Sequence, residues 1–220
     1  MQYYNLGHLF SDVARSNSQC PALHYLQEEY CYSELMFWVE SLANVLLDKG
    51  CRRGDVIAIG HDKQPLSYAM MLAGLRLGVT YVNLDVASPL ERNSNILNVC
   101  GAKMLFYDSH TYSKSMTELA HLHGCEVMLL DKNDLEVVDN DSLLKQLDLQ
   151  THVDGSCIAY IMFTSGSTGI PKGVAITHQN VLQFITWAQK NFKVNQQDNF
   201  ANLNPMYFDN SVFDFYISLF

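Results

Sequence analysis

The sequence is poor in basic residues. Its 220 residues include 14 lysines and arginines against 23 aspartates and glutamates, which gives a formal net charge of −9 at pH 7. A surface that binds nucleic acid neutralises phosphates with clustered lysine and arginine side chains. This composition offers no such surface, so we expect no nucleic-acid partner. A small polyphosphate remains compatible with it, because donors gathered in one loop outweigh a distributed surface charge.

Long apolar runs are also missing. The stretch 69–82 is interrupted by Arg76, whereas a helix that spans a bilayer needs about 20 mostly apolar residues. Residues 1–8 contain neither a basic segment nor an apolar one, so no signal peptide is predicted. We therefore expect a cytoplasmic protein with no membrane partner.

Closely spaced cysteine pairs are absent as well. The six cysteines are spread along the chain without a C-x-x-C pair, which is typical of reduced core thiols in a cytoplasmic protein. Among the eight histidines, the nearest approach to a metal pattern is His121 and His123 with Cys125. A solvated face at the end of a helix explains this spacing better than zinc does, so no metal site is predicted.

The residues that are present predict alternating strands and helices. Expected strands cover 55–60, 80–84, 103–107, 126–130, 158–163 and 174–177, and a further strand is expected over 200–203. Expected helices cover 6–14, 33–49, 65–77, 89–99, 114–123, 180–192 and 212–220, with a hairpin over 22–32. An acidic connector over 131–154 contains a short helix candidate at 143–147. Alternation with buried apolar strands indicates an α/β fold, a doubly wound, mainly parallel sheet with helices on both faces.

One loop, 164–173, joins two of these strands. It holds three glycines, which allow positive φ and close approach to a ligand, together with four hydroxyl side chains and a lysine behind a proline. In order, these residues are Thr164, Ser165, Gly166, Ser167, Thr168, Gly169, Pro171, Lys172 and Gly173. Backbone N–H groups in such a turn converge on an anion, so the loop predicts a polyphosphate cradle.

Three other interpretations of the loop were weighed. A plain hairpin turn needs neither four hydroxyls nor a lysine between proline and glycine. The phosphate loop G-x-x-x-x-G-K-[ST] fails on spacing, because Pro171 stands where its second glycine would be and Gly173 follows Lys172. A Ser–Lys hydrolase, with Ser165 or Ser167 as nucleophile and Lys172 as base, needs an oxyanion hole that a sequence does not reveal.

The stretch 160–174 resembles the signature loop of the adenylate-forming (AMP-binding) enzymes, which include acyl-CoA synthetases, luciferases and amino-acid adenylation domains. Residues 32–35, 75–85, 88–92 and 208–212 are similar to further segments of that family, in the family's order. Thr80 and Asn83 replace a usual alanine and a usual proline. The run 208–216 looks especially like D-alanine–carrier-protein ligases and nonribosomal peptide synthetase adenylation domains. The similarity covers nearly the whole chain.

The resemblance implies roles for named residues. The loop would hold the ATP phosphates through Thr164, Ser165, Gly166, Ser167, Thr168, Gly169 and Lys172, with Thr164 and Lys172 catalytic. Asp209 would pair with the α-ammonium of an amino acid, beside Phe208. An N-cap at the start of a helix is the other role open to Asp209, and we favour the substrate role.

The resemblance also implies a reaction: an amino acid and ATP give aminoacyl-AMP, and a phosphopantetheine carrier protein then accepts the aminoacyl group. The family's adenine, ribose and Mg²⁺ motifs, and its small C-terminal domain, come after the matched segments. Residues 1–220 are therefore expected to be the N-terminal portion of an AMP-binding domain, with the Mg²⁺ ligand outside this chain and a second chain as a further partner.

On this reading the chain is inactive by itself, and the apolar residues of 212–220 lack much of their packing. Two alternatives stay open: a non-catalytic scaffold remnant of the fold, and a ligase for another carboxylic acid of the acyl-CoA synthetase type.

Overall fold

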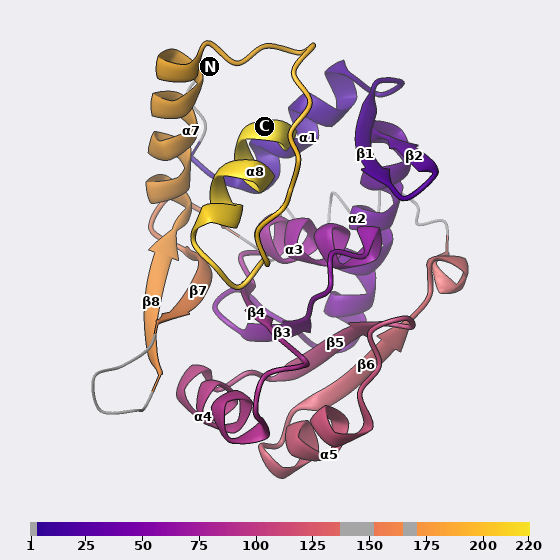
Figure 1. Cartoon of the computed structure of the whole chain (residues 1–220), viewed down its shortest axis with the longest axis vertical. Coiled ribbons are helices and arrows are strands. Elements are labelled where there is room, and N and C mark those ends of the chain that lie inside the picture. Colours follow the sequence, from indigo (N-terminus) through magenta and orange to yellow (C-terminus); the bar gives the residue numbers. More distant parts are fainter. Residues whose placement is uncertain (1–3, 137–151, 165–170) are drawn as a thin grey trace.

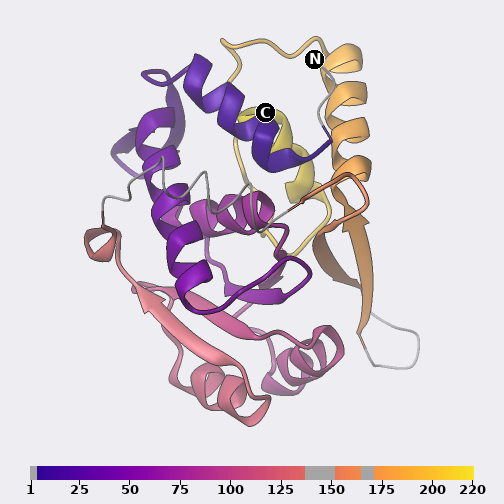
Figure 2. The ribbon, with the colours of Figure 1, turned by 180° about the vertical axis from the view of Figure 1, so that it is seen from behind.

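A six-stranded sheet with helices on both faces dominates the computed structural model, which describes residues 4–136, 152–164 and 171–220 (Figures 1 and 2). The strands are β1 (Pro21–Tyr25), β2 (Glu28–Cys31), β3 (Val56–Gly60), β4 (Thr80–Leu84), β5 (Met104–Asp108), β6 (Glu126–Leu130), β7 (Ile158–Thr164) and β8 (Lys172–Thr177). The helices are α1 (Leu6–Ser16), α2 (Tyr32–Asp48), α3 (Pro65–Leu77), α4 (Leu90–Cys100), α5 (Lys114–Leu122), α7 (His178–Phe192) and α8 (Asn210–Leu219), with a 3₁₀ turn at Lys132–Asp134. The helix expected at 143–147 lies outside the described residues.

The sheet has the strand order β6-β5-β3-β4-β7-β8. All neighbouring pairs are parallel except β7 and β8, which run antiparallel as a hairpin. The α/β fold with a mainly parallel sheet is thus confirmed. Strands β1 and β2 form the predicted hairpin outside this sheet.

Both faces of the sheet are buried. Along β5, Met104 and Phe106 belong to the core beneath α1, α2, α3 and α8, whereas Leu105 and Tyr107 belong to the core beneath α4 and α5. This alternation follows from the two-residue period of a strand. It explains why apolar residues occupy most positions of the central strands, on both faces.

Local sequence sets the helix boundaries. Pro65 occupies the first turn of α3, where a missing N–H does no harm, and Gly78 ends the helix with φ of 67°. Thr177 caps α7 together with Asn180. Helix α2 begins at Tyr32, one residue before the predicted start, and the Glu34 carboxylate accepts a hydrogen bond from the Cys31 N–H at 2.8 Å.

Two further predictions are corrected near the C-terminal helix. Residues 200–203 form no strand, because no neighbouring strand offers them ladder hydrogen bonds in the described part of the chain. The apolar side of α8 is not left without packing: Phe215, Tyr216, Ile217 and Leu219 are each 3% exposed or less. Tyr68 of α3 stacks on Phe215 with ring centroids 5.8 Å apart.

Candidate functional site

The parallel strands end at one edge of the sheet, and polar residues follow them there. His61 follows β3, Asp85 follows β4, and Thr164 is the last residue of β7. Because β8 runs antiparallel, it begins at the same edge with Lys172. Ligand sites of open α/β sheets lie outside the carboxyl ends of the strands, so this edge is the candidate site.

The predicted cradle sits on the β7–β8 hairpin. Thr164 and Lys172 form its last register pair, and the Thr164 hydroxyl donates to the Lys172 carbonyl oxygen at 3.5 Å. The Lys172 side chain is exposed and makes no ion pair or hydrogen bond with the residues the structure describes. The other predicted phosphate ligands, Ser165, Gly166, Ser167, Thr168 and Gly169, lie outside the described residues.

Gly173 is needed for packing rather than for positive φ, which corrects the sequence interpretation at this position. It lies in β8, and its φ is not among the positive values of the described glycines. A Cβ there would lie 2.9 Å from Ile161 Cγ2 and 3.1 Å from Phe163 Cζ. Glycine therefore lets β7 side chains pass across β8.

Asp209 and Phe208 stand at the entrance to α8, both exposed. Asp209 occupies the N-cap position, but its side chain accepts no capping hydrogen bond, and its backbone is helical with φ of −60°. The Ser211 hydroxyl instead donates to the Phe208 carbonyl oxygen at 2.6 Å. The Asp209 carboxylate is thus not engaged as a helix cap.

Tyr160 connects Asp209 to the hairpin strand. Burial raises the pKa of Tyr160 to about 12, and the negative charge of nearby Asp209 adds to this effect. Tyr160 belongs to β7, four positions before Thr164. Asp209 therefore lies near the strand whose last residue is Thr164.

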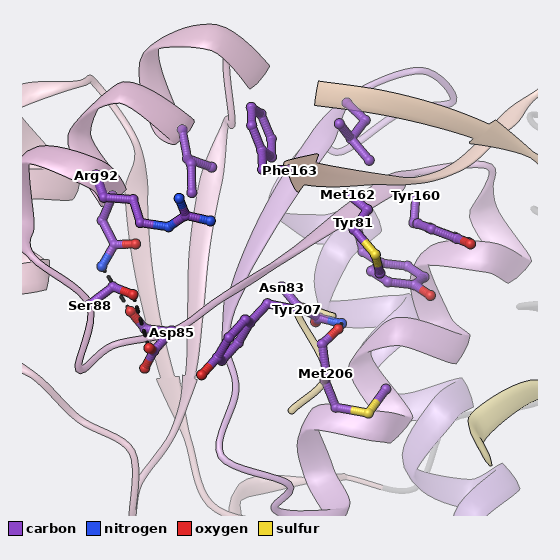
Figure 3. Close-up of a pocket in the computed structure, with 13 residues that line it drawn as sticks. Tyr81, Asn83, Asp85, Ser88, Arg92, Tyr160, Met162, Phe163, Met206 and Tyr207 are labelled. Carbon is purple, nitrogen blue, oxygen red and sulfur yellow. Dashed lines mark hydrogen bonds between the residues drawn. The ribbon is translucent and has the colours of Figure 1, made fainter. Parts of the chain in front are cut away.

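A hollow lies beside the hairpin strand, between the ends of β4 and β7, the start of α4 and the segment before α8 (Figure 3). Asp85, Ser88 and Arg92 stand on one side of it, and Tyr81, Tyr160 and Met162 on the other. Its other lining residues are Asn83, Asn93, Ile96, Ile161, Phe163, Met206 and Tyr207.

The polar groups of this hollow are partly paired. The Asp85 carboxylate accepts hydrogen bonds from the Ala87 N–H and the Ser88 hydroxyl, both at 2.9 Å. Burial raises the pKa of the Tyr207 phenol, and the Asp85 charge raises it further. The Oδ1 atoms of Asn83 and Asn93 are buried and have no hydrogen-bond partner among the described residues.

A wider groove lies under the β1–β2 hairpin, where Tyr25, Tyr30 and Trp38 line it. Two of its charged groups pair with each other: the Lys132 ammonium lies 3.3 Å from a Glu28 carboxylate oxygen, and it lies 5.4 Å from the centroid of the Tyr30 ring. Asp108, also in the lining, accepts the His110 N–H at 3.0 Å. Lys132 and Asp108 in this groove are therefore already engaged by other residues of the chain.

Within residues 4–136, 152–164 and 171–220, no group of three or more His, Cys, Asp or Glu side chains is arranged to hold a metal ion. No helix in those ranges is long and apolar enough to cross a bilayer. All six cysteines are free thiols, and burial raises the pKa of Cys51 and Cys125.

Sequence reasoning did not find the hollow. The segments 75–85 and 88–92 carried a family resemblance but no assigned role, and no motif pointed to Tyr207. The usable signal was positional: Asp85 and Ser88 directly follow a buried strand, and ligand-facing residues gather at such ends.

The fold is a doubly wound α/β domain. At the edge of its sheet, the β7–β8 hairpin is the candidate anion site, and the Asp209 carboxylate is the candidate group for binding a substrate. The profile of the family described as AMP-binding enzyme matches residues 10–220. The chain therefore belongs to the AMP-binding enzyme family, and the resemblance found in the sequence is confirmed.

Curated relatives agree with this family. The chain is 31% identical over 199 residues to an L-proline–[L-prolyl-carrier protein] ligase of Pseudomonas fluorescens, covering 88% of this chain and 39% of that protein. It is 29% identical over 216 residues to tyrocidine synthase 1 of Brevibacillus parabrevis, covering 96% of this chain and 19% of that protein. The chain thus spans well under half the length of either relative.

Solved structures share the fold. The N-terminal subdomain of Klebsiella oxytoca NpsA, in complex with 3-hydroxybenzoyl-AMSN, superimposes with a TM-score of 0.79 at 22% identity, covering 99% of this chain and 52% of that chain. VinN superimposes with a TM-score of 0.82 at 18% identity, covering 100% of this chain and 58% of that chain. At this identity the likeness shows the fold alone.

Proposed function

We propose that residues 1–220 form the front part of the large domain of an adenylating ligase that activates an amino acid as aminoacyl-AMP. The observation that carries the proposal is the placement of Lys172 and Thr164 at the mouth of the β7–β8 hairpin, with Asp209 close to Tyr160 of the same strand. Donors for a polyphosphate and an acceptor for an ammonium thus share one edge of the sheet.

The chemistry assigned to these residues is positioning and charge stabilisation. An oxygen of the substrate carboxylate forms a bond to the α-phosphorus of ATP, and the bond from that phosphorus to the bridging oxygen breaks. The electron pair leaves with pyrophosphate, whose growing charge Lys172 and the Thr164 hydroxyl stabilise. Asp209 holds the α-ammonium, so that the carboxylate faces the phosphorus.

A second step, in the proposal, transfers the aminoacyl group to the phosphopantetheine thiol of a carrier protein. The thiol sulfur forms a bond to the acyl carbon, and AMP leaves with the electron pair of the broken mixed-anhydride bond. Support comes from the relative whose name specifies an L-prolyl-carrier protein ligase.

Mg²⁺ does not fit the residues described. The Asp85 carboxylate is occupied by the Ala87 N–H and the Ser88 hydroxyl, and no acidic cluster surrounds it in the described part of the chain. A Mg²⁺ ion prefers an octahedral set of oxygen ligands.

Amino-acid-dependent exchange of labelled pyrophosphate into ATP tests the proposal. The assay uses this chain alone and the chain joined to the remainder of an adenylating domain, each with the twenty common amino acids and D-alanine. Exchange with one or a few amino acids supports the proposal, and reactions without amino acid serve as controls. Exchange driven by benzoate or octanoate instead identifies a ligase for another acid. Folded protein without any exchange identifies a non-catalytic remnant.

A further inference from the structure

The segment that leads into Phe208 and Asp209 has no strand partner, yet it is held in place. Residues 200–203 form no ladder hydrogen bonds, and Leu203 is 81% exposed. Two side chains from the ends of central strands donate to its carbonyl groups instead. Each contact joins residues more than a hundred positions apart in the sequence.

The first contact comes from the end of β3. The Lys63 ammonium donates to the Asn202 carbonyl oxygen at 2.7 Å. Lys63 has φ of 74°, a conformation that disfavours a residue with a side chain, and its N–H donates to His61 Nδ1 at 2.8 Å. A strained residue at a strand end persists when its surroundings hold it there, and such residues cluster at functional sites.

The second contact comes from β4. Asn83 Nδ2 donates to the Met206 carbonyl oxygen at 3.1 Å. The family resemblance places a proline at this position, and proline has no side-chain donor. A proline at this position could not make this contact. Since the Phe208 N–H in turn donates to the Pro205 carbonyl oxygen at 3.0 Å, a fixed segment 202–206 fixes the turn that presents Asp209.

We propose that Lys63 and Asn83 are positioning residues of the amino-acid site, which clamp the 202–206 segment to the carboxyl edge of the sheet and so hold Asp209 in place. The inference rests on the proposed function for its substrate. Neither side chain touches the substrate. They hold a loop that lacks secondary structure of its own. This matters because a residue that contacts the substrate keeps its position only when the groups around it support it.

Hydrogen exchange of the 220-residue chain tests the clamp without any activity. In Lys63→Met and in Asn83→Asp, which removes the donor at nearly constant size, we expect amides of 204–212 to exchange at least about tenfold faster. Amides of β3 and β5 keep their wild-type rates. Lys63→Arg and Asn83→Gln retain a donor and restore slow exchange. Lys193→Met is the matched control, because Lys193 is an exposed lysine that also has positive φ, at 54°.

In the chain joined to the remainder of an adenylating domain, the kinetics of pyrophosphate exchange test the positioning role, with the amino acid that gives the highest wild-type rate. We expect the amino-acid KM of Lys63→Met and Asn83→Asp to rise about tenfold with the ATP KM unchanged, and Lys63→Arg to restore it. Equal changes in both KM values, or unchanged exchange of 204–212 in both variants, overturn the proposal. A wild-type protein that exchanges with no amino acid refutes the proposed function instead, and the hydrogen-exchange comparison still decides the clamp.

Discussion

The hydroxyl groups of Tyr81 and Tyr216 lie 2.8 Å apart in the core, where Tyr81 is 4% exposed and Tyr216 is fully buried. Tyr81 belongs to β4 and Tyr216 to α8, so this hydrogen bond ties the helix that follows Asp209 to the central sheet. The ring of Tyr160 stacks against both, with centroid distances of 5.5 Å to Tyr81 and 6.2 Å to Tyr216.

Removal of one hydroxyl of this pair should destabilise the fold more than removal of both. Tyr81→Phe leaves the Tyr216 hydroxyl buried without a partner, which costs about 1–3 kcal/mol. The double variant with Tyr216→Phe leaves no unpaired group, so its free energy of unfolding should lie above the sum expected from the single variants. Urea unfolding of the four proteins measures the coupling. Strict additivity would show that the hydroxyls do not interact.

Lys172→Met should impair the chemical step of adenylation. Loss of one donor that stabilises charge in a transition state lowers a rate by about 100-fold or more, and the exposed Lys172 side chain has no role in folding among the described residues. Pyrophosphate exchange by a protein that carries the whole domain measures the effect. Lys190→Met, on the exposed surface of α7, is the control. A rate equal to wild type would remove Lys172 from the site.

Asp209→Asn should raise the amino-acid KM and leave the ATP KM unchanged. A charge-assisted hydrogen bond contributes about 1.5–3 kcal/mol, so the expected rise is roughly ten- to a hundredfold. Asp209 forms no capping bond, and the thermal stability should therefore stay at the wild-type value. Asp214→Asn, on the same helix, is the matched control. A loss of stability with unchanged KM would assign Asp209 to the helix rather than to the substrate.

Gly173→Ala should destabilise the β7–β8 hairpin. The added Cβ would approach Ile161 Cγ2 to 2.9 Å, and overpacking of this kind costs about 1–3 kcal/mol. Adding Ile161→Ala removes the clashing atom and should recover part of the loss. Urea unfolding of the single and double variants tests this. If both variants are as stable as wild type, strand β8 accommodates the added Cβ, and the expected clash with Ile161 is contradicted.

Acid should weaken the fold through His178. Its side chain is fully buried and accepts the Leu6 N–H at Nδ1, and burial lowers the pKa from 6.5 to about 4. Below pH 6.5 the unfolded chain binds a proton at this histidine, whereas the folded chain binds it only at about pH 4. The stabilisation of the folded state by the neutral His178 is therefore complete above pH 6.5 and is lost as the pH falls, by roughly 3 kcal/mol at pH 4.

His178→Asn keeps an acceptor for the Leu6 N–H and removes this titration. Its free energy of unfolding should fall less steeply between pH 6.5 and 4 than that of the wild type. The exposed His8 provides the control variant His8→Asn. Parallel pH profiles for wild type and His178→Asn would contradict the assignment.

Local patterns were enough to predict most of the fold. Apolar runs gave the strands around Phe106 and Tyr160, and Gly78 marked the end of a helix, because each signal lies within a few neighbouring residues. The strand expected at 200–203 failed because strand formation needs a partner, which propensity does not supply. The contacts of Lys63 and Asn83 were invisible for the same reason: each depends on a residue more than a hundred positions away.

The strand register has a consequence for folding order. Strand β7 meets its parallel neighbour β4 through a single register pair, Tyr81 with Tyr160, whereas β3 and β5 share four pairs and β7 and β8 share six. Strands β3 to β6 follow one another closely, so they assemble at low loop-closure entropy. The hairpin that carries Thr164 and Lys172 then docks late as a unit. In native-state exchange it should open as its own foldon, at a lower free energy than β3 and β5.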